Sequence, residues 1–316
     1  MKKINFLSLL AVIALSGCNK VEANPSLRDV DLKIISPKGA PAVALYKFVK
    51  GLTTVDNPAT ELLPQFHTND YDVIVAPTKG GLTKITKAKV NYELAATVTF
   101  GNFALVATGN DPDGVLNEGD KVLYFQPTDI PGAVFNYLYG DKGLETYTAA
   151  DDSKVGPSLS TGTYVVDETT TVNLDYVFAA EPLITNLGKT ANVVERAADV
   201  FKTLDDCKAI YQASVFVNKN TDKAKINNFL SLLEDDITKA VSNPNEIVET
   251  LKLVGEPEEQ AQKFKFNSTV IYNCMKDYNG LGLGFRKAFD YKTDINYFIN
   301  NILNSGLTIT DEAYFQ

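Results

Sequence analysis

The sequence predicts an α/β fold arranged in two lobes. The chain has 316 residues, more than one compact core usually holds, so two domains of ordinary size are expected. In its N-terminal half, β-branched runs alternate with loops and helical patterns, a rhythm typical of α/β sheets with parallel strands. A dense turn sequence at 109–114 and a β-rich run from Ala209 mark where the chain is expected to leave one lobe and return to it.

Each early strand is followed by a Gly/Pro/Thr loop and a helix start. The alternating run Val30–Ile35 leads into Pro37–Pro41, and Pro41 suits the first turn of a helix. The same order recurs at Pro77–Gly81 and at Gln126–Thr128. Residues 93–100 and 103–108 are expected to form a strand pair, 151–162 a loose polar loop and 280–284 a turn. The pattern predicts strands at 71–76, 121–125, 164–167, 175–180 and 209–217, and helices at 42–49, 82–88, 130–139, 183–187, 224–242, 244–254, 256–264, 268–276 and 293–303.

The N-terminus has the order of a secretory signal. Two lysines precede a short apolar run, Phe6–Leu15, and small residues follow it. The run is too short to span a bilayer, which takes about 20 residues. The end of this segment, Leu15-Ser16-Gly17-Cys18, resembles a bacterial lipobox, in which the cysteine becomes the first mature residue and carries acyl chains such as palmitate. We therefore expect residues 1–17 to be a lipoprotein signal peptide and 18–29 a polar tether, and the protein to be extracytoplasmic and lipid-anchored, in a periplasm or on the cell surface.

Charge and rare residues exclude several classes of function. The net charge is −9 and no long basic run occurs, which argues against nucleic-acid binding. His67 is the single histidine and lies in a polar segment, so no zinc set and no Ser/His/Asp arrangement is expected. Two cysteines remain after Cys18, namely Cys207 and Cys274, and the sequence leaves open whether they form a disulfide or two buried thiols.

The three strand–loop–helix connections are the best candidates for a ligand site. In open α/β sheets, such loops lie at the carboxyl ends of the strands, where ligands bind. Free backbone N–H groups at the helix starts favour anions or carbonyl oxygens, and glycines let a ligand approach the backbone.

Three segments carry a resemblance to a known family. They are Ile35–Pro41, the run Asp72–Thr78 (Asp-Val-Ile-Val-Ala-Pro-Thr) and the run Asp175–Pro182 (Asp-Tyr-Val-Phe-Ala-Ala-Glu-Pro). In order and spacing they resemble the solute-binding proteins of ABC importers, in the nitrate/taurine/thiamine-precursor branch of the type II periplasmic-binding-protein fold. The resemblance implies two mixed sheets flanked by helices with a hinge between the lobes, no catalysis and no cofactor.

The resemblance also implies lobe boundaries and a set of ligand-binding residues. Residues 30–108 and 209–316 would form the first lobe and 109–208 the second. Each site residue lies in a loop or strand end that matches the family's cleft. They are Gly39, Ala40, Pro41, Thr78, Lys79, Gly80, Gly81, Thr99, Phe100, Gly101 and Asn102 in the first lobe, and Gln126, Pro127, Thr128, Glu181 and Pro182 in the second.

Three of these side chains have two interpretations each. Phe100 could stack on a planar ligand or pack in the core, Lys79 could pair with an anion or point into solvent, and Glu181 could hold a cationic or N–H-rich ligand or cap the next helix. The chain departs from an anion-binding pattern because Arg28, Arg196 and Arg286 all lie far in sequence from these loops. A bidentate arginine is the favoured way to hold a carboxylate, sulfonate or phosphate. A neutral or weakly charged solute, aromatic in character and similar to a vitamin or its precursor, is therefore expected.

The sequence thus predicts a receptor that captures a small solute between two lobes and delivers it to the permease and ATPase subunits of an importer. We expect it to be a monomer, attached to the membrane through its lipid. The alternative is a cell-surface hydrolase or another lipoprotein enzyme on a two-lobe α/β fold, which would need a nucleophile–base pair or a carboxylate dyad that the sequence does not display.

Overall fold

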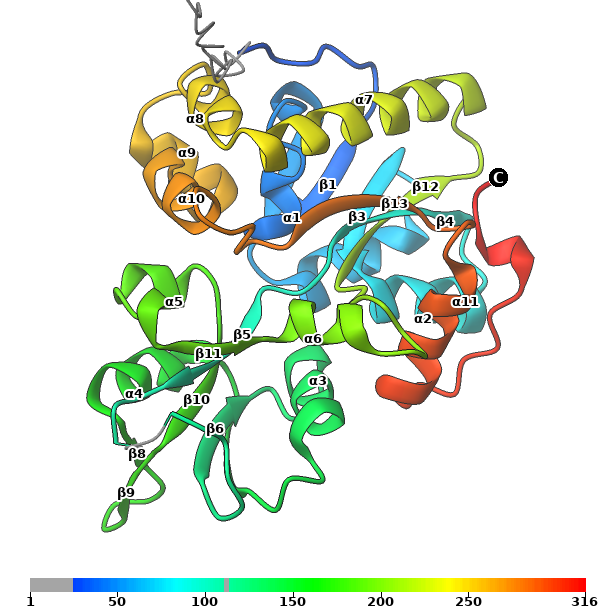
Figure 1. Ribbon diagram of the computed structural model, residues 1–316. Helices are drawn as coiled ribbons and strands as arrows, with labels where there is room; N and C mark the ends of the chain where they lie inside the picture. Colours follow the sequence, from blue (N-terminus) through cyan, green and yellow to red (C-terminus); the bar gives the residue numbers. More distant parts are fainter. Residues whose placement is uncertain (1–24, 111–113) are drawn as a thin grey trace, which may run out of the picture.

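A computed structural model describes residues 25–110 and 114–316. The signal peptide, Cys18 and most of the tether therefore lie outside the described residues. The described chain forms two α/β lobes, each built around its own mixed sheet (Figure 1). Within these residues, no helix combines the length and apolarity needed to cross a bilayer.

The first lobe contains a six-stranded sheet in the order β13-β4-β12-β3-β1-β2. β1 is parallel to β2 and β3, whereas β12 is antiparallel to β3 and β4, and β13 is antiparallel to β4. Its strands are β1 (Ile34–Pro37), β2 (Leu52–Val55), β3 (Val73–Pro77), β4 (Tyr92–Thr99), β12 (Ala213–Asn218) and β13 (Leu283–Lys287). Its helices are α1 (Ala40–Val43), α2 (Thr78–Ala88), α7 (Lys223–Ser242), α8 (Asn245–Leu251), α9 (Pro257–Phe264), α10 (Ser268–Met275) and α11 (Lys292–Tyr297).

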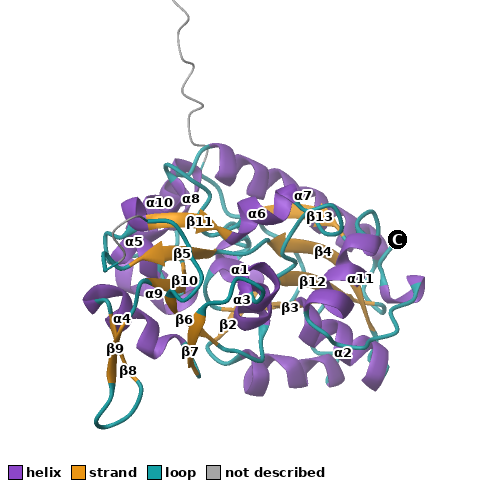
Figure 2. Ribbon diagram, turned by 60° about the horizontal axis from the view of Figure 1, so that its bottom comes forward, coloured by secondary structure: helices purple, strands orange, loops and turns teal. Residues whose placement is uncertain are grey.

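The second lobe contains a five-stranded sheet in the order β11-β5-β10-β6-β7, with a small β8–β9 hairpin beside it (Figure 2). β6 is parallel to β7 and β10, and β5 is antiparallel to β10 and β11. Its strands are β5 (Phe103–Ala107), β6 (Lys121–Phe125), β7 (Glu145–Ala149), β8 (Thr163–Val165), β9 (Thr171–Asn173), β10 (Tyr176–Ala180) and β11 (Val193–Arg196). Its helices are α3 (Ile130–Tyr139), α4 (Val155–Thr161), α5 (Leu183–Asn186) and α6 (Ala197–Thr203).

Short 3-10 and π turns fill several connections. They span Val49–Gly51, Pro58–Leu62, Leu63–His67, Asp152–Lys154, Thr190–Asn192, Phe298–Ile302 and Asp311–Ala313. The π turn Phe298–Ile302 continues α11, so the helix predicted at 293–303 is present in two geometries.

The predicted mixed sheets and flanking helices are confirmed, but several local predictions are wrong. The helix predicted at 42–49 is not formed as such, because α1 ends at Val43 and turns follow it. Residues 78–81 are the first turn of α2 and not a loop. Residues 151–162 contain α4 rather than a loose loop. The strands at 93–100 and 103–108 do not pair with each other, because β4 lies in the first sheet and β5 in the second. The turn predicted at 280–284 is limited to its first part, because Leu283 and Gly284 begin β13.

The first crossing between the lobes differs from the predicted one. Since β5 pairs with β10 and β11, the chain enters the second lobe at Phe100–Asn102 and not at 109–114. The turn-rich run instead connects β5 to β6 inside the second lobe, and its residues 111–113 lie outside the described part of the chain. The chain returns to the first lobe between α6 and β12.

Both crossings are held against β13 by aromatic contacts. Phe100 in the first crossing packs edge-on against Tyr211 in the second, with ring centroids 5.9 Å apart. The Arg286 guanidinium lies 5.1 Å from the Phe100 ring centroid and donates a hydrogen bond to the Tyr211 hydroxyl at 3.1 Å. Such cation–π contacts add to the packing of the rings. The Arg286 side chain therefore contacts both crossings and holds them against the edge of the first sheet.

The central strands of the first lobe are buried on both faces. Along β3, Val73 and Val75 join the core on one side of the sheet, whereas Ile74 and Ala76 join the core on the other side. This alternation follows from the two-residue period of a strand, and continuous apolar runs are typical of sheets covered on both faces. β-Branched residues favour the extended conformation, which is why the run is a strand.

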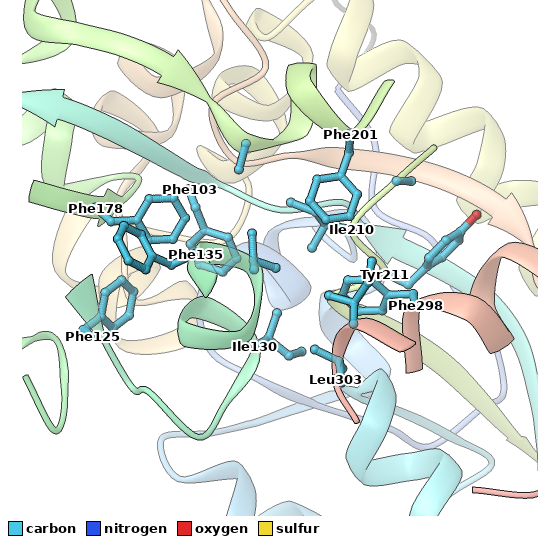
Figure 3. Close-up of a cluster of buried hydrophobic side chains, with 14 of the residues drawn as sticks. Phe103, Phe125, Ile130, Phe135, Phe178, Phe201, Ile210, Tyr211, Phe298 and Leu303 are labelled. Carbon is cyan, nitrogen blue, oxygen red and sulfur yellow. The ribbon is translucent and has the colours of Figure 1, made fainter. Parts of the chain in front are cut away.

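One of these cores continues into the second lobe (Figure 3). Phe201 of α6 packs against Phe298, with ring centroids 6.3 Å apart, and Phe298 packs against Tyr211 at 6.0 Å. In the second lobe, Phe135 and Phe178 form an edge-on pair at 5.5 Å. The lobes therefore share apolar packing beside their crossings.

Candidate functional site

A cavity of about 510 Å³ lies between the two lobes, a volume suited to a small molecule. Its walls come from both lobes and from both crossings. The lining residues are Lys38, Gly39, Ala40, Pro41, Asn102, Phe103, Phe125, Asp152, Val155, Ala180, Glu181, Pro182, Leu183, Asn186, Gln212, Lys265 and Phe266.

Strand ends position most of this lining. Lys38–Pro41 follow β1, Phe125 ends β6, and Glu181–Leu183 follow β10. The carboxyl ends of parallel strands meet at one edge of a sheet, so the two sheets present these ends to the same space. The crossings supply Asn102, just before β5, and Gln212, just before β12.

Aromatic rings form part of the wall on each side. Phe103 and Phe125 of the second lobe are almost fully buried and meet edge-on, with ring centroids 6.3 Å apart. Phe178 packs against Phe103 with ring centroids 5.8 Å apart, and Figure 3 shows the two rings next to each other. Phe266, which follows α9 in the first lobe, lines the same cavity. Rings presented from both lobes suit an apolar or planar solute.

Two side-chain amides join the crossings at the cavity. Asn102 donates through Nδ2 to the Glu181 carbonyl oxygen at 2.7 Å. Gln212 donates through Nε2 to Asn102 Oδ1 at 3.3 Å. The backbone of Gln212 is fixed at both ends, since its N–H donates to the Thr99 carbonyl at 3.0 Å and its carbonyl accepts from the Thr78 N–H at 3.1 Å.

The charges around the cavity are balanced. Lys38 Nζ pairs with Asp56 at 2.8 Å. Glu181, whose side chain is 1% exposed, lies 3.6 Å from Arg196. Lys265 and Asp152, one of each sign, are exposed.

Glu181 caps α5, which was one of its two predicted interpretations. Its Oε2 accepts a hydrogen bond from the Thr185 N–H at 2.9 Å. The Arg196 guanidinium, besides facing this carboxylate, stacks on Tyr278 of the first lobe at 4.2 Å from the ring centroid. Glu181 and its ion partner therefore tie the two lobes together at one end of the cavity.

The structure brings six of the predicted site residues to the cavity. These are Gly39, Ala40, Pro41, Asn102, Glu181 and Pro182. Their role in ligand binding stays a prediction.

The predicted residues of α2 do not line the cavity. The Thr78 hydroxyl is buried and lies 2.8 Å from the Ser214 hydroxyl. Lys79 Nζ lies 3.4 Å from the Leu303 carbonyl. A side chain at Gly81 would collide with the Phe216 ring, and one at Gly80 would press on Leu63. The two glycines thus serve the close packing of α2 against its neighbours.

The other predicted residues also lie outside the lining. Thr99 is fully buried, Phe100 packs on Tyr211 and Arg286, and Gly101 lies against Ile210. Gln126–Thr128 form the turn between β6 and α3, in which Pro127 and Thr128 are exposed. Phe100 thus matches its core interpretation.

Sequence reasoning missed several lining residues. Their segments looked like ordinary strand interior, helix or linker. The missed residues are Lys38, Phe103, Phe125, Asp152, Val155, Ala180, Leu183, Asn186, Gln212, Lys265 and Phe266. The one usable signal was position: Lys38, Phe125 and Ala180 are next to loops that the sequence did single out.

The structure also answers the question of the two cysteines. Cys207 and Cys274 are both buried and free, so no disulfide joins them. Burial raises the pKa of the Cys207 thiol to about 11 and that of the Cys274 thiol to about 12. In the described part of the chain, no group of three or more His, Cys, Asp or Glu side chains is placed to hold a metal ion.

The comparisons with known proteins identify the fold. No family model and no curated protein matches the sequence. The structure is similar to that of an ABC transporter from Parabacteroides distasonis, with a TM-score of 0.66 and 16% identity over 91% of this chain and 99% of that chain. It is also similar to the periplasmic aliphatic sulphonate binding protein SsuA from Escherichia coli, with a TM-score of 0.59 and 12% identity over 90% of this chain and 92% of that chain. The chain therefore has the two-lobed, type II periplasmic-binding-protein fold.

Proposed function

We propose that this protein is the solute-binding receptor of an ABC importer. It captures a small metabolite, vitamin-like or precursor-like, between its lobes and delivers it to the permease and ATPase subunits. The observation that carries the proposal is the interlobe cavity, lined by both lobes and by both crossings. A solute in this position contacts both lobes at once, so it favours the closed arrangement over an open one.

The proposed mechanism uses only binding energy. The aromatic walls Phe103, Phe125 and Phe266 take up apolar surface, and the amides of Asn102 and Gln212 orient polar groups. Closing the lobes removes water from the solute and orders the face that the permease would contact. The chain itself carries out no chemical step in this account.

The location is part of the proposal. A lipid on Cys18 would hold the receptor outside the cytoplasmic membrane, and the tether would leave the two lobes free to diffuse close to the importer. We expect the protein to act as a monomer.

The cavity lining contains no histidine, which the nucleophile–base form of the hydrolase alternative would need. Among the described residues, the single histidine, His67, is exposed, and its Nε2 lies 3.4 Å from Lys84 Nζ. Its side chain does not line the interlobe cavity.

A thermal-shift screen tests the proposal. The full chain carrying Cys18→Ser, which cannot be lipidated, is screened against amino acids, vitamins, nucleobases and aliphatic sulfonates. A bound solute at a hundredfold excess over its Kd stabilises the folded state by about 2.7 kcal/mol, so the melting temperature rises with concentration. If no small solute shifts the melting temperature and the protein instead cleaves a polymer, the receptor proposal fails.

A further inference from the structure

One contact between the lobes lies beside the cavity and outside both crossings. Arg196, at the end of β11 in the second lobe, stacks on Tyr278, which follows α10 in the first lobe. Glu181, which lines the cavity, has its Oε1 3.6 Å from Arg196 Nη1. Neither Arg196 nor Tyr278 belongs to a crossing, so only noncovalent forces hold their side chains together.

The second lobe positions Arg196 by itself. Its ion partner, Glu181, belongs to the same lobe and is fixed there by the hydrogen bond that its Oε2 accepts from the Thr185 N–H at 2.9 Å. The Arg196 side chain is only 14% exposed. Because Glu181 takes the charge of the guanidinium from one side, the flat face of that group is left for a ring of the first lobe.

The first lobe presents a matching surface to this pair. A Cβ at Gly280 would lie 3.2 Å from Glu181 Cγ, so the loop that carries Tyr278 lies close against the second lobe. Burial and the nearby Asp199 carboxylate of α6 raise the pKa of Tyr278 to about 12, so its hydroxyl stays protonated and can donate to that carboxylate. Tyr278 therefore meets the second lobe with both its ring and its hydroxyl.

The stacked pair distinguishes a closed arrangement of the lobes from an open one. The guanidinium carbon of Arg196 lies 4.2 Å from the Tyr278 ring centroid, a distance at which the cation and the ring attract each other, most strongly where water is excluded. Separating the lobes at this place would end the stacking but leave Glu181 beside Arg196, since those two side chains share a lobe. The stacking free energy therefore favours the closed arrangement.

We propose that the Arg196–Tyr278 stack is a latch that holds the lobes closed even without a solute and thereby strengthens the binding of every solute by the same factor. The consequence for binding rests on the proposed receptor function, because a receptor binds more weakly by the factor by which its closed population falls. Neither latch residue lines the cavity. The latch therefore sets affinity and leaves the choice between solutes to the cavity wall.

Distances between two spin labels test the latch without any solute. In the full chain with Cys18→Ser, the labels are attached to Ser160→Cys on α4 and Glu258→Cys on α9, two exposed positions on helices of different lobes (Figure 1). Cys207 and Cys274 are buried, so the two exposed cysteines take the labels. Pulsed electron resonance then gives the populations of short and long distances between the lobes.

Tyr278→Leu should raise the ratio of long to short label distances about tenfold, the effect of losing one cation–π contact from which water is excluded. Tyr278→Phe keeps the ring and should keep most of the closed population.

Tyr291→Leu is the matched control. It removes the same kind of contact inside the first lobe, where the Arg286 guanidinium lies 4.7 Å from the Tyr291 ring centroid, and should leave the label distances unchanged. Melting temperatures of all variants show that they are folded.

Arg196→Lys tests the other half of the stack. Lysine keeps a positive charge beside Glu181 but lacks the flat group that stacks on a ring, so this variant should open the lobes as Tyr278→Leu does. Because both changes remove one contact, the double variant should open the lobes no further than either single variant.

Three results would overturn the latch. One is a Tyr278→Leu chain with the same label distances as the parent chain, and another is an equal shift in Tyr291→Leu. The third is a parent chain that does not populate the distance of the described structure when no solute is present. None of these results bears on the receptor proposal, which fails only in the solute screen described above.

Discussion

Gly101 shows how one residue sets the geometry of the first crossing. Its φ of +86° is a conformation that side chains disfavour, and a Cβ there would lie 2.7 Å from Ile210 Cδ1 in the second crossing. The absence of a side chain therefore allows the two crossings to lie against each other.

Gly101→Ala should destabilise the protein by about 2–5 kcal/mol, the sum of a left-handed backbone cost of about 1–2 kcal/mol and an overpacking cost of about 1–3 kcal/mol. Urea denaturation measures the change in the free energy of unfolding. Gly188→Ala is the control, because Gly188 also has a positive φ, +65°, but has no atom within 4 Å of the added Cβ. It should cost only about 1–2 kcal/mol. If both variants lose the same free energy of unfolding, the proposed steric role of Gly101 is wrong.

The two buried cysteines should be inert in the folded protein. Because the thiolate is the reactive form and both pKa values are raised well above 9, the thiols stay protonated at pH 8. In the Cys18→Ser chain, Ellman's reagent should label neither cysteine in native buffer and both in denaturant. Rapid native labelling, or a denatured protein with no free thiol, would show that the described geometry of these cysteines is incorrect.

At the scale of elements, a buried ion cluster connects the N-terminal segment to α7 and α8. Asp236 of α7 is fully buried, accepts two hydrogen bonds from Arg28 and lies 3.7 Å from Lys47 Nζ. Lys47 in turn pairs with Glu246 of α8 at 2.5 Å. A buried pair contributes little over an apolar one, but removing a single partner strands the other charges.

Asp236→Ala should therefore destabilise the first lobe by about 3–5 kcal/mol. Its neighbour Asp235 provides the comparison, since it also lies 3.5 Å from Arg28 but is half exposed and pairs with Lys239 on the surface. Asp235→Ala should cost under about 1 kcal/mol. Urea unfolding of the two variants measures the free energy of unfolding. If Asp236→Ala lowers it no more than Asp235→Ala does, the cluster does not have the proposed stabilising role.

The sequence predicted individual elements well where the pattern was local. β6 and α3 have the predicted bounds, because an apolar strand and a proline-started helix each carry their own signal. The sequence analysis missed β2, β7, β9, β11 and β13, since short, partly exposed strands are stabilised by the neighbours they pair with. The start of α2 was misread because Gly80 and Gly81 resemble a loop, whereas their role is close packing.

At the scale of the whole molecule, the two-lobed architecture was predictable and the exact crossing was not. The turn-rich run at 109–114 is the stronger turn signal, yet Phe100–Asn102 carries the chain between the sheets. Turn chemistry reports where a chain bends and not which sheet the next strand joins. Long-range pairing decides the latter.

The cavity shows the same division between local signals and tertiary structure. The loop after β1 was found from its strand–loop–helix order and the segment after β10 from the family resemblance, and both line the cavity. Gln212, Phe266 and Phe125 carry no local signal of a binding role, because they meet only when the crossings and α9 are brought together. The sequence therefore indicated the sheet edge at which the cavity lies, but not all of the residues that line the cavity.

The interlobe cavity is the proposed binding site of the solute. Ala180 ends β10 and lines the cavity, so Ala180→Trp should fill part of its 510 Å³. Ala191→Trp places the same side chain on an exposed position of the second lobe and serves as the control. Titration of both variants with a solute that stabilises the parent chain is the most direct test. We expect Ala180→Trp to weaken binding at least about tenfold, a loss of some 1.4 kcal/mol in binding free energy, and Ala191→Trp to bind like the parent chain. Unchanged binding by a folded Ala180→Trp variant would contradict it.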